Sequence, residues 1–236
     1  MMGANPGSAE TAKDIPAILR VLLVDDHPLL RQALRAVLEK EKGIEIVGEA
    51  GNGCEAIEQA TRLLPDVVIM DISMPEMDGL EATRRIKAAL PQISVLALTV
   101  YDDDESIQGI LQAGASGYLI KSVFGEEVIH AVRAVASGDM VLSPAIGKLL
   151  VKHAAQHPLR PVKLDAGEKL SARELEVLKL AARGMTNKDI ASALGLTVRT
   201  VKGHLADIFS KLRVNSRTEA VITGLRAGFL SLEDIK

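Results

Sequence analysis

The run Val67-Val68-Ile69-Met70 is continuously apolar and ends at Asp71. A second run of the same kind, Val21-Leu22-Leu23-Val24, ends at the acidic pair Asp25-Asp26. Continuously apolar segments of this length are typical of parallel strands that are covered by helices on both faces. In an open parallel α/β sheet, ligands bind beyond the carboxyl ends of the strands. The two runs therefore predict a sheet edge with three carboxylates, able to hold a divalent cation and a phosphoryl group.

The first half of the chain alternates short apolar strands with amphipathic helices. We predict five βα units, with strands near 20–24, 44–49, 67–70, 94–98 and 117–120 and helices near 28–40, 53–63, 79–90, 103–113 and 124–137. Two of these strands run into further polar residues, Thr99 and Lys121. Four strand ends would then each offer a polar group to one phosphate. The alternative is that each aspartate only fills a turn or caps a helix. The five polar groups at the strand ends would then have to coincide by accident; these are Asp25, Asp26, Asp71, Thr99 and Lys121.

Length and composition limit the class of protein. The 236 residues have room for two domains, and the hydrophobic content of 47% indicates a globular chain. An aromatic content of 2%, with no Trp, argues against stacking platforms for bases or flavins. The single Cys54 excludes an internal disulfide framework and fits a reducing compartment, so we expect a cytoplasmic location. We find no apolar run that is typical of a signal peptide or a membrane span.

The formal net charge of -3 hides an asymmetry between the two halves of the chain. Residues 18–138 hold 11 Lys and Arg against 19 Asp and Glu, whereas residues 139–236 hold 16 against 10. The acidic half suits a cation site, and the basic half suits a polyanion. An ordinary solvated surface would also explain the charges taken alone.

The periodic pattern divides the chain into four segments. We predict an N-terminal tail over 1–17, an α/β domain over 18–138, a linker over 139–168 and a helical domain over 169–236. The linker prediction rests on a weak hydrophobic pattern that three prolines interrupt.

The last segment carries the signals of several short helices. Capping-box spacing marks three helix starts, at Ser171 with Glu174, Thr186 with Asp189, and Ser216 with Glu219. A fourth helix follows Thr197, and its apolar stripe consists of Val201, Leu205, Ile208 and Leu212. Its opposite face would display Arg199, Lys202, Gly203, Ala206, Ser210 and Arg213. A short helix, a turn at Gly195 and a basic-faced helix are the helix-turn-helix arrangement.

Together these motifs resemble a two-component response regulator of the NarL/FixJ class, in which a receiver domain is joined to a LuxR-type helix-turn-helix domain. The resemblance covers about residues 18–229. The receiver motifs are Val-Asp-Asp-His (24–27), Met-Asp-Ile-Ser-Met-Pro-Glu-Met-Asp-Gly (70–79), Leu-Thr (98–99) and Gly-Ala-Ser-Gly-Tyr-Leu-Ile-Lys (114–121). The motifs of the second domain are Leu-Ser-Ala-Arg-Glu-Leu-Glu-Val-Leu (170–178), Asn-Lys-Asp-Ile-Ala (187–191) and Thr-Val-Lys-Gly-His (200–204).

The resemblance implies a flavodoxin-like (βα)5 receiver domain followed by an all-α domain of four helices. It implies that Asp71 accepts a phosphoryl group from the phosphohistidine of a sensor histidine kinase, without turnover of a separate substrate. Asp25, Asp26 and Asp71 would hold Mg2+ together with the main-chain carbonyl of Ser73. The switch residues would be Thr99, Tyr118 and Lys121.

The same resemblance places the helix 198–213 in the major groove of double-stranded DNA, in a protein that would dimerise when phosphorylated. Lys202 is the best candidate for a base or phosphate contact. Gly203 and Ala206 stand where relatives often carry larger or basic side chains, so direct base contacts would be fewer. Residues expected closer to the DNA backbone are Asn187, Lys188, Thr197, Arg199, Thr200, His204 and Lys211.

Two other functions are open to the same residues. A phosphatase could use Asp71 as a nucleophile, but such enzymes usually place a second aspartate two positions later, where this chain has Ser73. A DNA-binding protein that needs no phosphorylation could use the first domain only for dimerisation. The complete set of Asp25, Asp26, Asp71, Thr99 and Lys121 disfavours this alternative.

Overall fold

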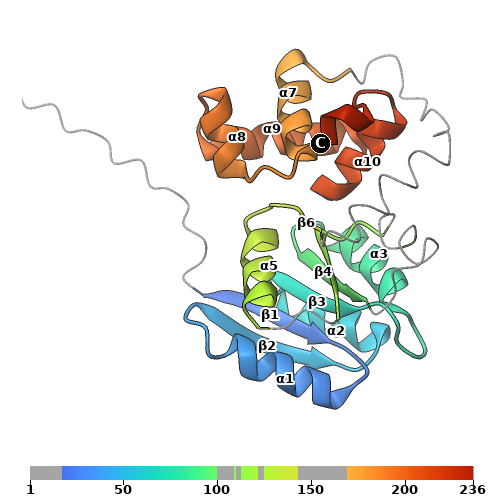
Figure 1. Cartoon of the computed structure of the whole chain (residues 1–236). Helices are drawn as coiled ribbons and strands as arrows, with labels where there is room; N and C mark the ends of the chain where they lie inside the picture. The colour runs from blue at the N-terminus through green and yellow to red at the C-terminus, as the bar shows by residue number, and fades with distance from the viewer. Residues whose placement is uncertain (1–17, 100–108, 110–112, 122–124, 143–168, 236) are drawn as a thin grey trace, which may run out of the picture.

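The computed structural model describes residues 18–99, 109, 113–121, 125–142 and 169–235. Its elements form an α/β part followed by a helical part (Figure 1). The predicted helix over 103–113 and most of the predicted linker lie outside the described residues. None of the described helices is long and apolar enough to cross a membrane.

The α/β part contains the five predicted strands and one more. The strands are β1 (Leu19–Val24), β2 (Ile44–Ala50), β3 (Val67–Asp71), β4 (Ser94–Thr99), β5 (Gly117–Ile120) and β6 (Val141–Leu142). The helices are α1 (Pro28–Leu38), α2 (Gly53–Leu63), α3 (Gly79–Ala89) and α5 (Glu126–Ala136). The predicted βα order is therefore confirmed over the described residues, and the additional β6 comes from the start of the predicted linker.

All six strands are parallel and lie in the order β2-β1-β3-β4-β5-β6. After β2 the chain returns past β1 to form β3, so β1 and β3 are neighbours at the point where the direction of winding reverses. A crevice forms at the carboxyl ends of the strands at such a reversal. The ends of β1 and β3 carry the three predicted acidic residues.

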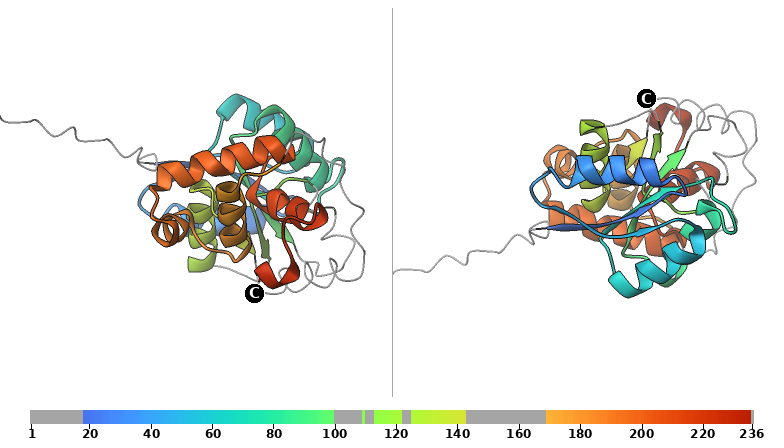
Figure 2. Two further views of the ribbon diagram at one scale, coloured as in Figure 1. Left: turned by 90° about the horizontal axis from the view of Figure 1, so that it is seen from above. Right: turned by 90° about the horizontal axis from the view of Figure 1, so that it is seen from below.

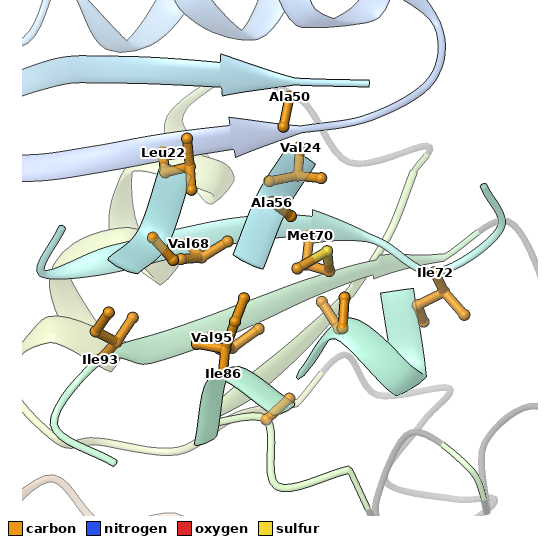
Figure 3. Packing of buried hydrophobic residues seen from close by; sticks show 14 of the residues in the cluster. Leu22, Val24, Ala50, Ala56, Val68, Met70, Ile72, Ile86, Ile93 and Val95 are labelled. Carbon is orange, nitrogen blue, oxygen red and sulfur yellow. The ribbon is translucent and has the colours of Figure 1, made fainter. Parts of the chain in front are cut away.

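Helices cover both faces of the sheet, which explains the continuously apolar strands. Leu22, Val68 and Met70 point to the face of α2 and α3, where Ala56 and Ile86 pack against neighbouring strand residues (Figure 3). The alternate residues of the same strands face α1 and α5, and this second cluster includes Val21, Leu23, Ile69, Leu34 and Val128. Strand side chains alternate between faces, so a run that is buried on both faces must be apolar throughout.

The helical part has the elements that its capping signals predict. Its helices are α7 (Ala172–Ala182), α8 (Asn187–Leu194), α9 (Val198–Leu212) and α10 (Arg217–Arg226), followed by a 3-10 turn, Leu232–Ile235. Ser171 and Thr186 each form a complete capping box. Ser216 accepts the N–H of Glu219, but the Glu219 carboxylate accepts the N–H of Asn215 at 2.6 Å.

The basic-faced helix α9 packs as predicted. Its stripe of Val201, Leu205, Ile208 and Leu212 is buried in the core of the helical part. Gly195 ends α8 in the left-handed conformation, with φ of 63°. The helix-turn-helix of α8 and α9 is thus fixed by an apolar seam and a glycine that permits the turn.

The start of α3 must carry a residue without a side chain. A Cβ on Gly79 would lie 1.9 Å from the carbonyl oxygen of Asp71, and the Gly79 N–H donates to Ile72 O at 2.9 Å. The close approach of this backbone to the end of β3 sets the position of the Asp71 strand end.

We expect Gly79→Ala to lower the free energy of unfolding of the α/β part by about 2 kcal/mol or more, because backbone must move to relieve the overlap. The matched change Gly203→Ala meets no atom within 4 Å. It lies inside α9, so it should stabilise the helical part by up to about 1 kcal/mol. Urea unfolding followed by circular dichroism measures both changes, and equal stabilities of Gly79→Ala and wild type would contradict the overlap.

Candidate functional sites

The ends of three strands meet at one acidic pocket. Asp25 directly follows β1, Asp71 ends β3, and Lys121 follows β5. The Lys121 ammonium lies 2.7 Å from Asp25 Oδ2 and 2.7 Å from Asp71 Oδ2. All three side chains are at most 11% exposed. The structure thus brings together the two carboxylates and the lysine that the strand-end argument predicted.

Burial and charge perturb both partners of this ion pair. Burial raises the pKa of Asp71, and the neighbouring Asp25 carboxylate raises it further, while Lys121 acts in the opposite direction. Burial alone would lower the pKa of Lys121, but its ion pairs with Asp25 and Asp71 leave that pKa raised. The lysine therefore stays protonated at neutral pH and compensates two carboxylates at once.

Asp26 and His27 complete a group that suits a cation. His27 Nδ1 lies 2.7 Å from Asp26 Oδ1, and ligand atoms of Asp25, Asp26, His27 and Asp71 all lie within 4.8 Å of one another. Carboxylate oxygens are the ligands that Mg2+ prefers, so Asp25, Asp26 and Asp71 suit this ion better than the His27 imidazole does. The side chains therefore fit Mg2+. The predicted role of the Ser73 carbonyl stays a prediction, and its N–H donates to Asp71 Oδ1 at 3.2 Å.

Three residues that the sequence analysis did not single out support the acidic loop. The Arg31 guanidinium donates to the main-chain carbonyl of Asp25. Its Nε also donates to Glu49 at 3.1 Å, and Arg35 holds the second oxygen of Glu49 at 2.7 Å. Arg31 comes from α1 and Glu49 from β2, so no local sequence pattern joins them. This network fixes the backbone from which the Asp25 carboxylate projects.

The other two predicted switch residues, Thr99 and Tyr118, are both buried. Thr99 ends β4 and is 1% exposed, and its carbonyl accepts the Lys121 N–H at 2.7 Å. Tyr118 is 0% exposed and lies in the core cluster on the α2 and α3 face. Its hydroxyl donates to Ala115 O at 3.4 Å, and burial raises its pKa well above the usual value. Thr99 and Lys121 are therefore joined through backbone, and Tyr118 occupies a buried position.

The second candidate site is the outer face of the helix-turn-helix. The predicted contact residues Arg199, Thr200, Lys202, Gly203 and Ala206 of α9 are exposed. The α9 N-cap Thr197 and Lys188 of α8 are exposed as well. His204 is half-buried. The Thr197 hydroxyl accepts the Thr200 N–H at 3.1 Å and caps the helix. The chain thus presents an open, basic helix surface of the kind that enters a DNA groove.

Two predicted contact residues are placed differently from the rest. The Lys211 ammonium lies 2.6 Å from the Glu174 carboxylate, and this ion pair joins α9 to the start of α7. Asn187 is 3% exposed, and its N–H donates to Asp139, which follows α5 in the α/β part. The Asn187 side-chain amide also donates to Ser137 O at 3.0 Å, so Asn187 is covered by the α/β part, whereas Lys211 is paired but still 36% exposed.

Family models match both parts of the chain. Residues 21–133 match the response regulator receiver domain, and residues 168–223 match the LuxR family of bacterial regulatory proteins. The chain is also 41% identical to the transcriptional regulatory protein LiaR of Bacillus subtilis over 208 residues, which cover 87% of this chain and 96% of LiaR. The chain belongs to the LuxR-type response regulators.

Further relatives support this membership. The response regulator VraR of Staphylococcus aureus is 42% identical over 204 residues, which cover 86% of this chain and 95% of VraR. Among solved structures, the response regulator ChrA of a heme-sensing two-component system has a TM-score of 0.50 at 34% identity, covering 91% of this chain and 100% of ChrA. A LuxR-family response regulator from Aurantimonas sp. SI85-9A1 has a TM-score of 0.55 at 32% identity, covering 59% and 99%.

This response regulator therefore has the predicted class of fold, a parallel α/β receiver domain with a C-terminal helical DNA-binding domain. It is a transcriptional response regulator, as its relatives are. The family resemblance indicated by the sequence motifs is confirmed by both family models.

We expect Mg2+ to stabilise the receiver domain, by about 2.7 kcal/mol when its concentration is about 100 times the dissociation constant. Asp26→Asn should remove most of this effect, because it takes away a carboxylate that does not pair with Lys121. Glu45→Gln, which removes an exposed carboxylate on β2, should keep it. Differential scanning calorimetry with Mg2+ and with a chelator provides the comparison. An equal Mg2+ shift in Asp26→Asn and Glu45→Gln would show that the ion binds elsewhere.

Proposed function

We propose that this response regulator accepts a phosphoryl group on Asp71 from the phosphohistidine of a sensor histidine kinase and thereby controls its binding to DNA. The observation that carries the proposal is the pair of carboxylates, Asp25 and Asp71, that share the ammonium of Lys121 at 2.7 Å each. A carboxylate in this position has a positive group ready for the oxygens of an incoming phosphate. Asp25, Asp26, Asp71 and the Ser73 carbonyl would hold Mg2+.

The chemistry is a transfer between two nucleophiles. A carboxylate oxygen of Asp71 forms a bond to phosphorus, the bond from phosphorus to the kinase histidine breaks, and the histidine nitrogen keeps the electron pair. When bound, Mg2+ supplies positive charge to the phosphoryl oxygens. Lys121, which contacts both Asp25 and Asp71, contributes a second positive charge. The product is an acyl phosphate, and the chain returns to its starting form when water removes the phosphoryl group.

Thr99 and Tyr118 would convert this event into a change of surface. A phosphoryl group adds about 1.5 to 2 negative charges and three acceptor oxygens. Thr99 ends β4, which pairs with the strand that ends at Asp71, so its hydroxyl would be drawn to such a group. Tyr118 lies three residues before Lys121 on the same strand, so movement of this strand end would reach its buried ring.

The DNA-binding part of the proposal rests on the exposed face of α9. Lys202 and Arg199 offer positive charge on this face, with Thr197, Thr200, Gly203 and Ala206 beside them. The residues that would lie nearer the DNA backbone are Asn187, Lys188, His204 and Lys211. We propose a homodimer on paired half-sites, since operator symmetry usually mirrors protein symmetry. A partner of this kind implies action in the cytoplasm, where chromosomal DNA is found.

A phosphatase is less well supported. Its general acid is expected two residues after the nucleophile, at Ser73, whose side chain is exposed and carries no carboxylate. The curated relatives reported above are named as regulators. Self-catalysed phosphorylation and dephosphorylation of Asp71 remain part of the proposal, without a separate substrate.

We expect the full chain to gain the mass of one phosphoryl group when it is incubated with acetyl phosphate and Mg2+. Asp71→Asn should gain none, because the amide is a poor nucleophile. Asp78→Asn is a matched control, since Asp78 caps α3 and Asn serves equally well as an N-cap. Intact-protein mass spectrometry measures the gain. Labelling of Asp71→Asn at the level of the wild type would refute the assignment of the acceptor.

We expect Lys202→Ala to weaken binding to duplex DNA and to reduce by about 1 the slope of log affinity against log salt concentration, if Lys202 neutralises a phosphate. Lys179→Ala removes the same charge from α7, where Lys179 pairs with Asp234 at 3.3 Å, and should change neither quantity. Fluorescence anisotropy at several salt concentrations gives both values. Equal losses in the two variants would point to general charge in place of the α9 face.

A further inference from the structure

The two domains touch at the N-terminal end of α8. Asp139 follows α5 of the receiver domain, and one of its carboxylate oxygens accepts the N–H of Asn187 at 2.8 Å. The same oxygen lies 3.7 Å from Nη1 of Arg217 in α10. The Asn187 amide group donates in turn to Ser137 O at 3.0 Å. Figure 1 shows α8 and α10 on the side of the helical domain that faces α5 and β6. An acidic side chain of one domain therefore sits in a positive corner of the other.

The corner has the features of an anion site. Asn187 is the first residue of the eight-residue helix α8, and the N–H groups of a first helical turn lack partners within the helix and carry partial positive charge. Arg217 adds a full charge and is only 4% exposed. Its Nη2 donates to Ala181 O at 3.1 Å and to Met185 O, but its Nε is buried without a hydrogen-bond partner in the described part of the chain.

A buried guanidinium in this position needs a nearby negative group. Burial lowers the pKa of Arg217 to about 10, and Asp139 is the charged group that counteracts this. If the receiver domain moved away, Arg217 and the N–H of Asn187 would lose the anion that compensates them. Another anion would then bind more favourably in the same corner.

The architecture of the helical domain identifies that anion. In a helix-turn-helix the second helix enters the major groove and the first helix crosses the DNA backbone. The N-terminus of the first helix is then a natural contact for a phosphate. Here the first helix is α8, and the exposed Lys188 stands next to Asn187. The outer face of α9 is open, whereas the start of α8 is covered by the receiver.

We propose that Asp139 is a stand-in for a DNA phosphate: its carboxylate occupies the backbone-contact site at the start of α8, and DNA takes this place when the receiver domain releases it. The proposal rests on the DNA binding proposed above and adds how the receiver opposes it. Binding of the duplex and docking of the receiver compete for the same N–H and guanidinium.

The interface also connects the Asp139 contact to Tyr118, one of the predicted switch residues. On α10, Ile222 packs against the receiver cluster that contains Tyr118 and Ala115. A Cβ on Gly114 would lie 3.2 Å from Glu219 Oε1, so the Glu219 carboxylate lies directly over this turn. A rearrangement around Tyr118 would therefore disturb the surface on which α10 rests and loosen the contact of Asp139.

The side chain of Asp139 can be removed without loss of the receiver fold. Its main chain closes α5, where the Asp139 N–H donates to Ala134 O at 2.9 Å and Gly138 has φ of 84°. Its carboxylate accepts a hydrogen bond from Asn187 and pairs with Arg217, and both contacts join it to the helical domain. Asp139→Ala is thus a selective change, and Glu127→Ala is its matched control, because Glu127 is an exposed carboxylate in the first turn of α5, away from Asp139.

The first measurement needs no DNA. Hydrogen exchange of the Asn187 amide in the full, unphosphorylated chain reports the contact directly, because this N–H has its partner in Asp139 and not within α8. We expect at least about tenfold faster exchange in Asp139→Ala and no change in Glu127→Ala. Unchanged protection of the Asn187 amide in Asp139→Ala would overturn the proposal that the Asp139 carboxylate occupies the start of α8.

The second measurement is anisotropy with a labelled duplex of mixed sequence, since phosphate contacts do not depend on sequence. We expect unphosphorylated Asp139→Ala to bind about tenfold more tightly than the wild type, and Glu127→Ala to stay within about twofold. Equal tightening in both variants would mean a general charge effect and overturn the stand-in role. A third outcome is that Asp139→Ala exchanges its Asn187 amide faster but binds the duplex no more tightly, although the beryllofluoride form of the chain does bind it. This outcome would also overturn the stand-in role of Asp139. Failure of every form to bind the duplex would overturn the proposed DNA binding as well.

Discussion

Two buried carboxylates share one ammonium at the carboxyl edge of the sheet, and the receiver domain depends on this balance. Asp25, Asp71 and Lys121 follow three different strands, so the balance exists only when β1, β3 and β5 are in register. Each charge would be costly to bury without the others. A phosphoryl group on Asp71 would add negative charge beside the Lys121 ammonium. Lys121 would then have to share its contacts between Asp25 and the phosphoryl oxygens.

Much of this could be predicted from the sequence, because the governing patterns are local. The apolar run before Asp71 specifies a strand buried on both faces, and the reversal of strand order then brings Asp71 beside Asp25. The stripe that begins at Val201 specifies the buried side of α9 and hence its outer face. In these cases periodicity alone determines which side chains are exposed.

Contacts between distant elements were not predicted. Arg31 bonds both to the backbone of Asp25 and to Glu49 of β2, and nothing near Arg31 in the sequence indicates the pairing with Glu49. The capping signal at Ser216 predicted that Glu219 would return to the cap residue, but the carboxylate bonds to Asn215 and lies over Gly114 of the receiver. Asn187 was expected to face DNA and is buried against Asp139. Each outcome depends on which surfaces of the two domains meet.

The two outer strands of the described sheet have unequal consequences for contact with other molecules. β6 has two residues, so this edge offers few unpaired backbone groups as a template for a strand of another chain. β2 has seven residues, but its register with β1 shifts between the pairs Val21↔Ile46 and Leu22↔Gly48, and Glu45 and Glu49 lie along it. Irregular pairing and charge on an edge strand both discourage aggregation through sheet extension. The receiver sheet is thereby protected at each side by a different device.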